Sequence, residues 1–329
     1  MSFSEKVQAQ QFLPVKGMTQ RGRLTMRHFF KNDAKRNDPF ASFLGIIIIM
    51  DYEKINLEDY VKTGEGGQGI AYTHKTDNRL VNLYNPGFEA DVAVDEFGAA
   101  QAMYELGVPT PRPYRLVTDG ERVGAEYELI EGKRSFARII SQEPDRMEEV
   151  SLTFARVARE LHAVKADTSR LPSMKKRMQD FYHKDGVVPV LLRDKVLPIL
   201  DTIPDTPYCL HGDMQIGNII TDGRRNLWID IGQAAYGDPQ WDLSLCWRIS
   251  QIAEPARTDQ LFHLTPEQMQ QHWNIFAPAY YGIAPQEMGS IIKRILPYAA
   301  IKSAYMYYLT FHKPIPDDMG HRLLDSMLG

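Results

Sequence analysis

Three oxygen-bearing side chains in the middle of the chain have the types and the spacing that phosphoryl transfer requires. Asp213 is followed five positions later by Asn218, and a second carboxylate comes at Asp230. In this chemistry one carboxylate accepts the proton of an attacking hydroxyl, while an amide and another carboxylate hold the Mg²⁺ that neutralises charge on the phosphates. The set therefore predicts ATP-dependent phosphoryl transfer.

The chain between these residues has the pattern of a β-hairpin that would bring two of them together. Ile219–Thr221 and residues 227–229 are short β-prone runs, and residues 222–226 between them favour a tight turn. With the hairpin centred on that turn, Asn218 enters the first strand opposite Asp230, which leaves the second. Directly paired residues lie about 5 Å apart, so both side chains could reach one metal ion.

A structural alternative exists for each of these residues alone, because Asp and Asn are common turn formers and caps. The wider pattern favours a site. Residues 211–218 read HGDMQIGN and residues 237–243 read GDPQWDL. Together with the later Asp they resemble the aminoglycoside phosphotransferase and choline kinase superfamily, whose members carry an HGDxxxxN loop, a metal-binding Asp and a GDPxxDL segment. The resemblance spans roughly residues 57–250.

The resemblance implies a role for each residue of these motifs. Asp213 would be the catalytic base, and Asn218 and Asp230 would be the magnesium ligands. Three further residues would support the catalytic loop: His211, Asp238 and Asp242. In relatives of this kind the last of these braces the loop through its backbone, so loss of Asp242 should reduce activity without removing a reacting group.

A glycine-rich segment upstream is a candidate loop for covering phosphates. Gly64, Gly66 and Gly69 form a G-x-G-x-x-G pattern, and residues 60–61 and 70–74 on either side can form the two strands of a hairpin. Glycine lets main-chain N–H groups approach phosphate oxygens closely. The pattern alone also occurs in flexible loops, but its position upstream of the other motifs favours nucleotide binding.

The elements that follow resemble the small lobe of a kinase fold. Residues 80–84 have a strand pattern, and residues 91–106 have a helix pattern that Gly107 ends. In that fold the third strand supplies a Lys for the α- and β-phosphates, and the helix supplies a Glu that pairs with it. Glu96 occupies a suitable place in the helix, whereas Asn82 stands where the family has its Lys.

This departure from the family pattern predicts weaker nucleotide binding. Asn82 can donate hydrogen bonds but carries no charge, and a charge-assisted contact to phosphate is roughly twice as strong as a neutral one. Lys75 is expected at a hairpin tip, close to the turn at residues 76–78. Lys62, nearer the glycine loop, is the better substitute.

The residues and the resemblance together imply an α+β, two-lobed, protein-kinase-like fold. Residues 50–131 would form a small β-rich N-lobe with the glycine-rich loop, and residues 132–329 a larger helical C-lobe with the catalytic loop, the metal site and the acceptor pocket. ATP and Mg²⁺ would bind between the lobes. The γ-phosphoryl group would pass to a hydroxyl of a small molecule that resembles an aminoglycoside, choline or a sugar.

Charge and composition argue against a nucleic-acid-binding protein and against a membrane protein. A net charge of -4 and a pI near 6.2 argue against a nucleic-acid partner. The longest apolar run, residues 43–50, is far shorter than the roughly 20 residues of a membrane span. Two cysteines, Cys209 and Cys246, show no metal-ligand spacing and suit a reducing cytoplasm.

Residues 1–49 are predicted to be an extension outside the fold. The first 50 residues carry eight Lys or Arg against three Asp or Glu, although the whole chain is acidic. The segment is either an upstream start that precedes a natural beginning at Met50 or a basic arm for partner binding.

Two alternatives to the kinase remain open on the sequence. A catalytically impaired, nucleotide-binding pseudokinase would explain Asn82, although it would have no obvious need to keep all three residues of the chemistry. A Mg²⁺-dependent hydrolase with Asp213 as nucleophile would explain the metal ligands but not the glycine-rich loop.

Overall fold

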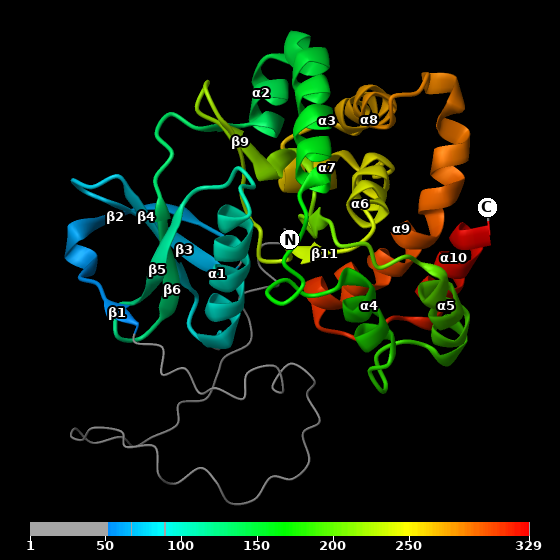
Figure 1. The fold of residues 1–329 in the computed structure, drawn as a ribbon, viewed down its shortest axis with the longest axis horizontal. Coiled ribbons are helices and arrows are strands. Elements are labelled where there is room, and N and C mark those ends of the chain that lie inside the picture. The colour runs from blue at the N-terminus through cyan, green and yellow to red at the C-terminus, as the bar shows by residue number, and fades with distance from the viewer. Residues whose placement is uncertain (1–51, 67, 89, 329) are drawn as a thin grey trace, which may run out of the picture. The chain divides into compact units, whose positions relative to one another are not determined.

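A mixed sheet with one long helix against it forms the first part of the fold, as seen in a computed structural model that describes residues 52–66, 68–88 and 90–328 (Figure 1). Within the described residues this sheet has six strands in the order β1-β5-β6-β4-β3-β2. Their bounds are β1 (Glu53–Lys54), β2 (Tyr60–Glu65), β3 (Gly69–His74), β4 (Arg79–Tyr84), β5 (Pro113–Thr118) and β6 (Val123–Glu128). The predicted extension, residues 1–49, lies outside the described residues.

The helix against this sheet is α1 (Ala90–Glu105), which contacts β5 and β6. Its buried face consists of small residues and Met103, and Gly107, with φ +83°, follows its end. The helix predicted over residues 91–106 is thus confirmed. On the sheet itself Val81 and Leu83 of β4 are fully buried, whereas Asn82 between them points to the other face, as strand alternation requires.

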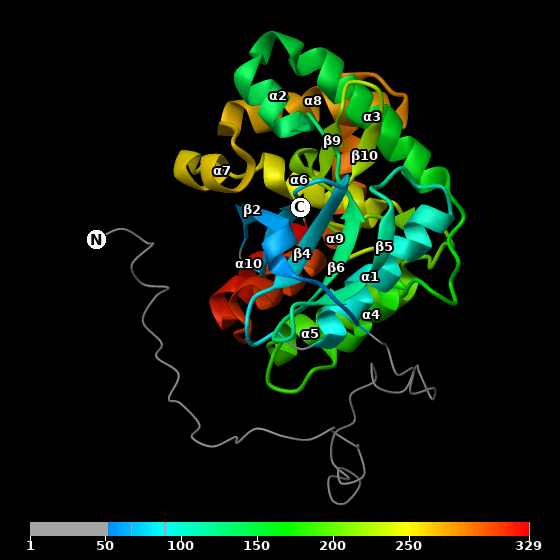
Figure 2. The ribbon, with the colours of Figure 1, turned by 90° about the vertical axis from the view of Figure 1, so that its left-hand side faces the viewer.

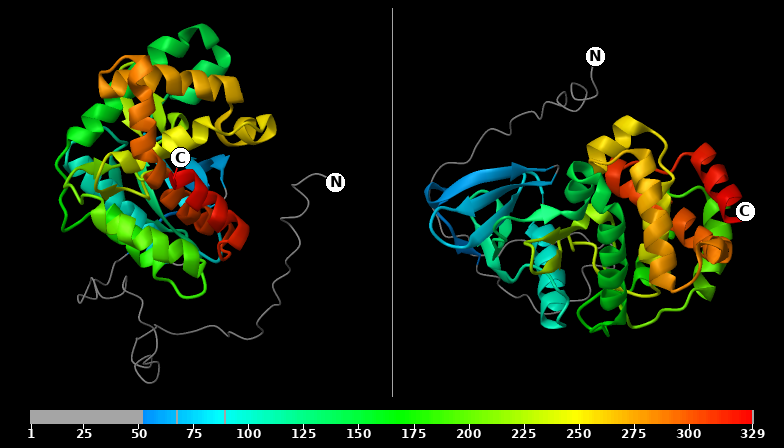
Figure 3. Two further views of the ribbon diagram at one scale, coloured as in Figure 1. Left: turned by 90° about the vertical axis from the view of Figure 1, so that its right-hand side faces the viewer. Right: turned by 90° about the horizontal axis from the view of Figure 1, so that it is seen from above.

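Helices dominate the second part of the fold. In chain order they are α2 (Phe136–Gln142), α3 (Met147–Ala163), α4 (Met174–Tyr182), α5 (Val190–Thr202), α6 (Gln240–Ser250), α7 (Pro255–Phe262), α8 (Pro266–Tyr281), α9 (Met288–Phe311) and α10 (Asp317–Leu328). Four short 3₁₀ turns accompany the described helices: η2 (Leu57–Asp59), η3 (Pro144–Arg146), η4 (Ile216–Asn218) and η5 (Pro285–Glu287). Helix α3 packs along α8, and α9 packs on α6 and α10 (Figure 2, Figure 3).

Two small sheets interrupt this helical part and carry the predicted motifs. Within the described residues one has the order β10-β9-β7, built from β7 (Arg134–Ser135), β9 (Ile219–Thr221) and β10 (Asn226–Trp228). The other pairs β8 (Cys209–Leu210) with β11 (Ala235–Tyr236). The hairpin predicted around residues 222–226 is confirmed, because Ile219 pairs with Trp228 across it.

The buried surface explains why these strands hold their place. Phe154 of α3 contacts Trp228 and Phe276 edge to face, with ring centroids 5.7 and 4.8 Å apart. Such aromatic contacts add to the burial of large apolar side chains. The hairpin therefore packs on α3, which in turn packs on α8. No helix in the part of the chain that the structure describes is long and apolar enough to cross a membrane.

Candidate active site

The predicted catalytic loop begins where β8 ends. His211 and Gly212 follow that buried strand, and their main-chain N–H groups donate to the two carboxylate oxygens of Asp242 at 2.7 and 2.9 Å. Asp242 belongs to the first turn of α6. The loop is thus held by its backbone from a helix, and the next residue, Asp213, is half-buried.

His211 joins the catalytic loop to the segment that carries the second carboxylate. Its Nε2 donates to the carbonyl of Ile229 at 3.0 Å, and its Nδ1 accepts from the main-chain N–H of Asp213 at 3.2 Å. These partners require the neutral tautomer with its proton on Nε2. Because Ile229 immediately precedes Asp230, one imidazole fixes the positions of Asp213 and Asp230 relative to each other.

Asn218 lies against Asp213. Its Nδ2 donates to the Asp213 carbonyl at 2.9 Å and lies 3.4 Å from the carboxylate Oδ2. Its Oδ1 accepts from Gln215 Nε2 at 2.7 Å, and Gln215 Oε1 in turn accepts from Gly217 N at 2.6 Å. A carbonyl oxygen has two lone pairs, so Asn218 Oδ1 keeps one for a metal ion. Gln215 is not among the predicted site residues. Its position in the sequence, between Asp213 and Asn218, could have indicated that it belongs to the site.

The register of the hairpin differs by one residue from the prediction. Ile229 N donates to the Asn218 carbonyl at 3.0 Å, so Asn218 lies opposite Ile229 and not opposite Asp230. The cause is the turn: Asp222 Oδ1 accepts the N–H groups of residues 224–225 at 2.9 and 2.7 Å, which moves the centre of the turn towards the N-terminus. Asp230 therefore comes directly after the strand pair.

Asp230 leaves the hairpin with a left-handed backbone, at φ +59°. Few residues other than glycine adopt this conformation, and Asp is among those that do. Its side chain keeps contact with solvent, but surrounding protein raises the pKa of its carboxyl, and the nearby Asp213 carboxylate raises it further. A carboxyl group beside a second carboxylate is suited to a cation.

The glycine-rich loop and Asn82 also lie together. Gly66 N donates to the Gly69 carbonyl at 2.9 Å and closes the turn between β2 and β3, while Gly64 lies within β2. A Cβ atom at Gly69 would lie 2.6 Å from the Leu83 carbonyl and 3.1 Å from Asn82 Oδ1. Glycine is therefore required at position 69 by the close approach of β4, and the Asn82 amide lies beside the loop.

Glu96 does not pair with a cation in the described structure. Its carboxylate accepts a short hydrogen bond from the hydroxyl of Tyr84, two residues beyond Asn82 on the same face of β4. A Cβ atom at Gly232 would lie 3.2 Å from Glu96 Cγ, so Glu96 also leans on the segment that follows the second carboxylate. Burial raises the pKa of Glu96, and the hydrogen bond from Tyr84 opposes that shift. Tyr84 was not predicted as a site residue. Because side chains alternate along a strand, its position two residues after Asn82 could have indicated that both lie on one face.

Neither Lys62 nor Lys75 is seen to replace the lysine that the family has at the position of Asn82. Lys62 donates to Glu65 at 2.6 Å, and its side chain is half exposed. Lys75 is exposed beside the turn, as predicted, and donates to the Glu58 carbonyl at 2.5 Å. Lys62 is therefore engaged on the outer strand of the sheet, and its proposed substitution for a lysine at Asn82 gains no support.

Asp242 is the centre of a buried charge network. Beyond the two main-chain donors it accepts from His162 Nε2 at 3.2 Å, and Lys302 Nζ lies 3.8 Å from Oδ1. Burial acts to raise the pKa of Asp242, but His162 and Lys302 outweigh it and bring the pKa down to about 2. Lys302 also donates to the Trp241 carbonyl at 3.2 Å. Lys302 is far away in the sequence, and no local pattern signalled it.

Asp238, the other acidic residue of the GDPQWDL segment, lies outside this network. Its Oδ2 accepts from the hydroxyl of Tyr298 at 2.8 Å, and its Oδ1 accepts from Gln240 N at 2.9 Å at the start of α6. These contacts fix the entry to the helix, and support of the catalytic loop by Asp238 stays a prediction.

The donor set at the centre of the site suits a hard divalent cation. Asn218 offers an amide oxygen and Asp230 a carboxylate, which are the ligand types that Mg²⁺ prefers, and water and phosphate oxygens complete such sites. Among the described residues no three His, Cys, Asp or Glu side chains converge on one point. A metal ion here would thus depend on a nucleotide for several of its ligands.

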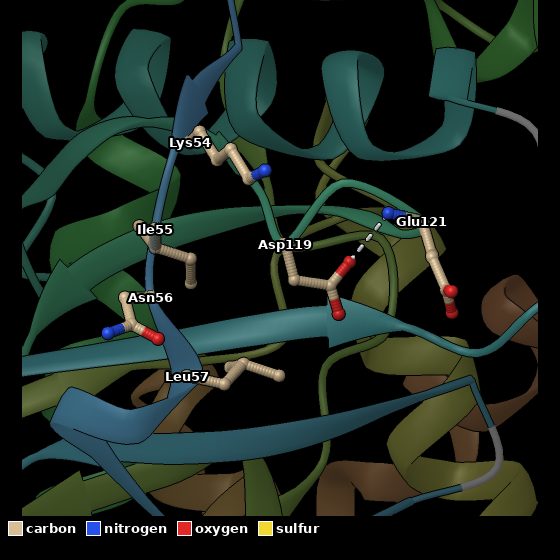
Figure 4. A pocket seen from close by; sticks show the side chains of 6 residues that line it. All are labelled: Lys54, Ile55, Asn56, Leu57, Asp119 and Glu121. Atoms are coloured by element: carbon tan, nitrogen blue, oxygen red, sulfur yellow. Dashed lines mark hydrogen bonds between the residues drawn. The ribbon is translucent and has the colours of Figure 1, made fainter. Parts of the chain in front are cut away.

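A cavity of about 570 Å³ lies elsewhere, at the outer edge of the six-stranded sheet (Figure 4). It is lined by Lys54, Ile55, Asn56, Leu57, Asp119 and Glu121. Asp119 Oδ1 accepts from Glu121 N at 2.9 Å at its rim. None of these residues belongs to the predicted site, so the cavity is a separate feature.

A β-sheet lobe and a helical part define a protein-kinase-like fold. A family model described as the phosphotransferase enzyme family matches residues 66–265. The match covers more than half of the chain, and the chain therefore belongs to the phosphotransferase enzyme family.

Solved structures with TM-scores above 0.5 share the fold at low sequence identity. Aminoglycoside phosphotransferase APH(4)-Ia is 14% identical, covers 82% of this chain and 91% of its own, and has a TM-score of 0.53. Amicoumacin kinase hAmiN, solved with AMP-PNP and Ca²⁺, is 12% identical, covers 84% of this chain and 89% of its own, and has a TM-score of 0.51. A choline/ethanolamine kinase family protein from Mesorhizobium loti is 16% identical over 88% of this chain and 93% of its own, with a TM-score of 0.49. No curated protein matches the chain.

Proposed function

We propose that this protein is an ATP- and Mg²⁺-dependent small-molecule kinase that transfers the γ-phosphoryl group to an alcohol hydroxyl. The observation that carries the proposal is the link through His211, which places Asp213 and Asp230 on two segments joined by one imidazole. Asn218 contacts Asp213 from the other side. Proton acceptance and metal binding thus fall within one small region, as phosphoryl transfer requires.

In this proposal each residue has one task. Asp213 orients the acceptor hydroxyl and takes its proton, and Asn218 and Asp230 hold the metal ion. A bound Mg²⁺ supplies neutralisation of the charge on the phosphates. The loop with Gly64, Gly66 and Gly69 covers the phosphates, with Asn82 and Glu96 beneath it. Catalysis comes from positioning and charge stabilisation rather than from covalent chemistry.

The lobe division belongs to the same proposal. The nucleotide-binding part would comprise residues 50–131 and the acceptor-binding part residues 132–329. APH(4)-Ia has been solved in a ternary complex with ADP and hygromycin B, and hAmiN in a complex with AMP-PNP, Ca²⁺ and Ami. We extend that use to this chain, with a hydroxylated amine or sugar as acceptor. The two free, buried cysteines are consistent with work in the cytoplasm.

The test is incubation with Mg²⁺ and ATP labelled at the γ-phosphate, together with a panel of aminoglycosides, amino alcohols and sugars. Label should move to one acceptor class. Asp213→Ala should reduce the rate by about 10²- to 10⁴-fold, the usual contribution of a general base. Asp222→Asn is the matched control, because it removes a carboxylate from the same hairpin while an amide can still cap the turn. Label released to water instead would favour a hydrolase.

A pseudokinase is the second candidate, because Asn82 removes a cation from the phosphate site and Glu96 is paired with Tyr84 instead. Under this alternative Mg²⁺ and ATP raise the melting temperature of the protein, since a ligand that binds the folded state stabilises it. No acceptor is labelled, and Asp213→Ala changes nothing that can be measured.

A further inference from the structure

Arg177 of α4 is a cation that the predicted site does not include, and it lies behind the segment that follows Asp230. Its Nη1 donates to the carbonyl of Gln233 at 2.8 Å, and its Nη2 donates to the carbonyl of Ala234 at 3.3 Å. Both of these hydrogen bonds end on main-chain oxygens of one short stretch. Arg177 therefore holds the path of the backbone rather than a neighbouring side chain.

The Gln233 carbonyl is also the point where the two functional segments touch. A Cβ atom at Gly212 would lie 1.9 Å from this oxygen, and Gly212 has φ +81°. Gly212 immediately precedes Asp213, and Gln233 comes three residues after Asp230. A guanidinium bonded to the Gln233 carbonyl thus controls the contact between the catalytic loop and the metal-binding segment.

The surroundings of Arg177 disfavour the charged form of its guanidinium. Burial lowers the pKa of its guanidinium, while Tyr305 and Asp95 of α1 act in the opposite direction. Tyr305 also donates from its hydroxyl to Gln233 Oε1 at 3.3 Å, which secures the side chain of the same residue. A buried charge is unfavourable unless its donors are satisfied. The two carbonyls take two of its five N–H donors, so the guanidinium holds this segment at two points.

We propose that Arg177 is a positioning residue for the metal site, which rests on the proposed function of Asp230 as a metal ligand. It sets the position of Asp230 by fixing the carbonyls of Gln233 and Ala234 against Gly212. Residues that orient a metal ligand typically change metal affinity by 10- to 100-fold when they are mutated. Loss of Arg177 should therefore weaken metal binding more than it weakens the fold.

The test measures metal binding without turnover. Mn²⁺ is titrated into the full chain with ADP present, and free Mn²⁺ is followed by electron paramagnetic resonance. Arg177→Met should raise the dissociation constant of Mn²⁺ by roughly 10- to 100-fold, and Arg177→Lys, which keeps the charge and a donor, by less. Lys175→Met is the matched control: Lys175 lies on the same helix and donates to the carbonyls of Asp201 and Ile203 at 2.9 and 2.8 Å, away from the site.

The outcomes separate the two proposals. Unchanged Mn²⁺ affinity in folded Arg177→Met, or an equal loss in Lys175→Met, overturns the role of Arg177 and leaves the proposed function standing. A wild-type chain that binds no Mn²⁺ with ADP overturns the proposed function, and the role of Arg177 with it. If Arg177→Met does not fold, Arg177→Lys decides: an affinity equal to that of the wild type overturns the role.

Discussion

Replacing Asp242 by Asn tests the buried network beneath the catalytic loop. The carboxylate has four partners: the N–H groups of His211 and Gly212, the His162 ring and, at 3.8 Å, the Lys302 ammonium. An amide has the same shape but no charge, and it can accept on one side only. The substitution therefore leaves a buried ammonium group without its counter-charge.

The structure gives a magnitude for this loss. The pKa of Asp242 falls to about 2 in the folded protein, from 3.8 in the unfolded chain. Because the folded pKa is the lower one, the stabilisation is fully present above pH 4 and is lost as the pH falls through 2. The difference corresponds to roughly 2 kcal/mol at pH 7. Stranding Lys302 adds to it, and removal of one partner from a buried ion pair costs about 3 to 5 kcal/mol in total.

Urea unfolding at pH 7, followed by tryptophan fluorescence, measures this free energy. Asp238→Asn is the control in the same segment, and it should cost about 1 to 2 kcal/mol, because the two donors to its carboxylate, the Tyr298 hydroxyl and the Gln240 N–H, are uncharged. The double variant Asp242→Asn with Lys302→Met should be more stable than the sum of the single effects by about 0.5 to 3 kcal/mol, because it removes both charges. Equal losses for Asp242→Asn and Asp238→Asn, or strict additivity in the double variant, would refute the reasoning.

Three further predictions concern nucleotide binding, loop geometry and pH. Asn82→Lys should lower the KM for ATP about fivefold by adding roughly 1 kcal/mol of charge-assisted bonding to phosphate, and steady-state kinetics that show a higher KM would contradict it. Gly212→Ala should abolish transfer, because its Cβ would meet the Gln233 carbonyl at 1.9 Å; normal activity in a labelled-ATP assay would exclude that contact. His272 is buried beside Ser151, with a hydrogen bond of 2.9 Å between them, and burial lowers the pKa of its imidazole to about 3. As the pH falls below 6.5, this histidine therefore takes up a proton in the unfolded chain but not in the folded chain. The wild type should lose roughly 2 kcal/mol of unfolding free energy between pH 7 and pH 5, and His272→Gln should lose less; parallel urea midpoints at the two pH values would contradict this.

Local signals in the sequence were sufficient for the elements around the site. Turn residues and β-prone runs predict the hairpin of β9 and β10, and helical spacing with Gly107 predicts α1, because both patterns depend on neighbours in the chain. The register of the hairpin was wrong by one residue. It depends on which main-chain N–H groups the Asp222 side chain accepts, and several choices fit the same residues.

Contacts between distant residues could not be predicted in this way. The partner of Glu96 is the Tyr84 hydroxyl, and the charge that faces Asp242 is on Lys302, 60 residues later in the chain. Arg177 likewise meets the main chain of residues 233–234 through a fold that brings α4 beneath them. No periodicity marks such pairs, since each is set by the packing of separate helices.

The most direct test of the central claim is a crystal of the protein grown with AMP-PNP and Mn²⁺, with anomalous diffraction used to locate the metal. We expect a Mn²⁺ peak in contact with both Asn218 Oδ1 and the Asp230 carboxylate, beside the terminal phosphate. Bound AMP-PNP with the metal held by other residues, or with no metal between those two side chains, would contradict it.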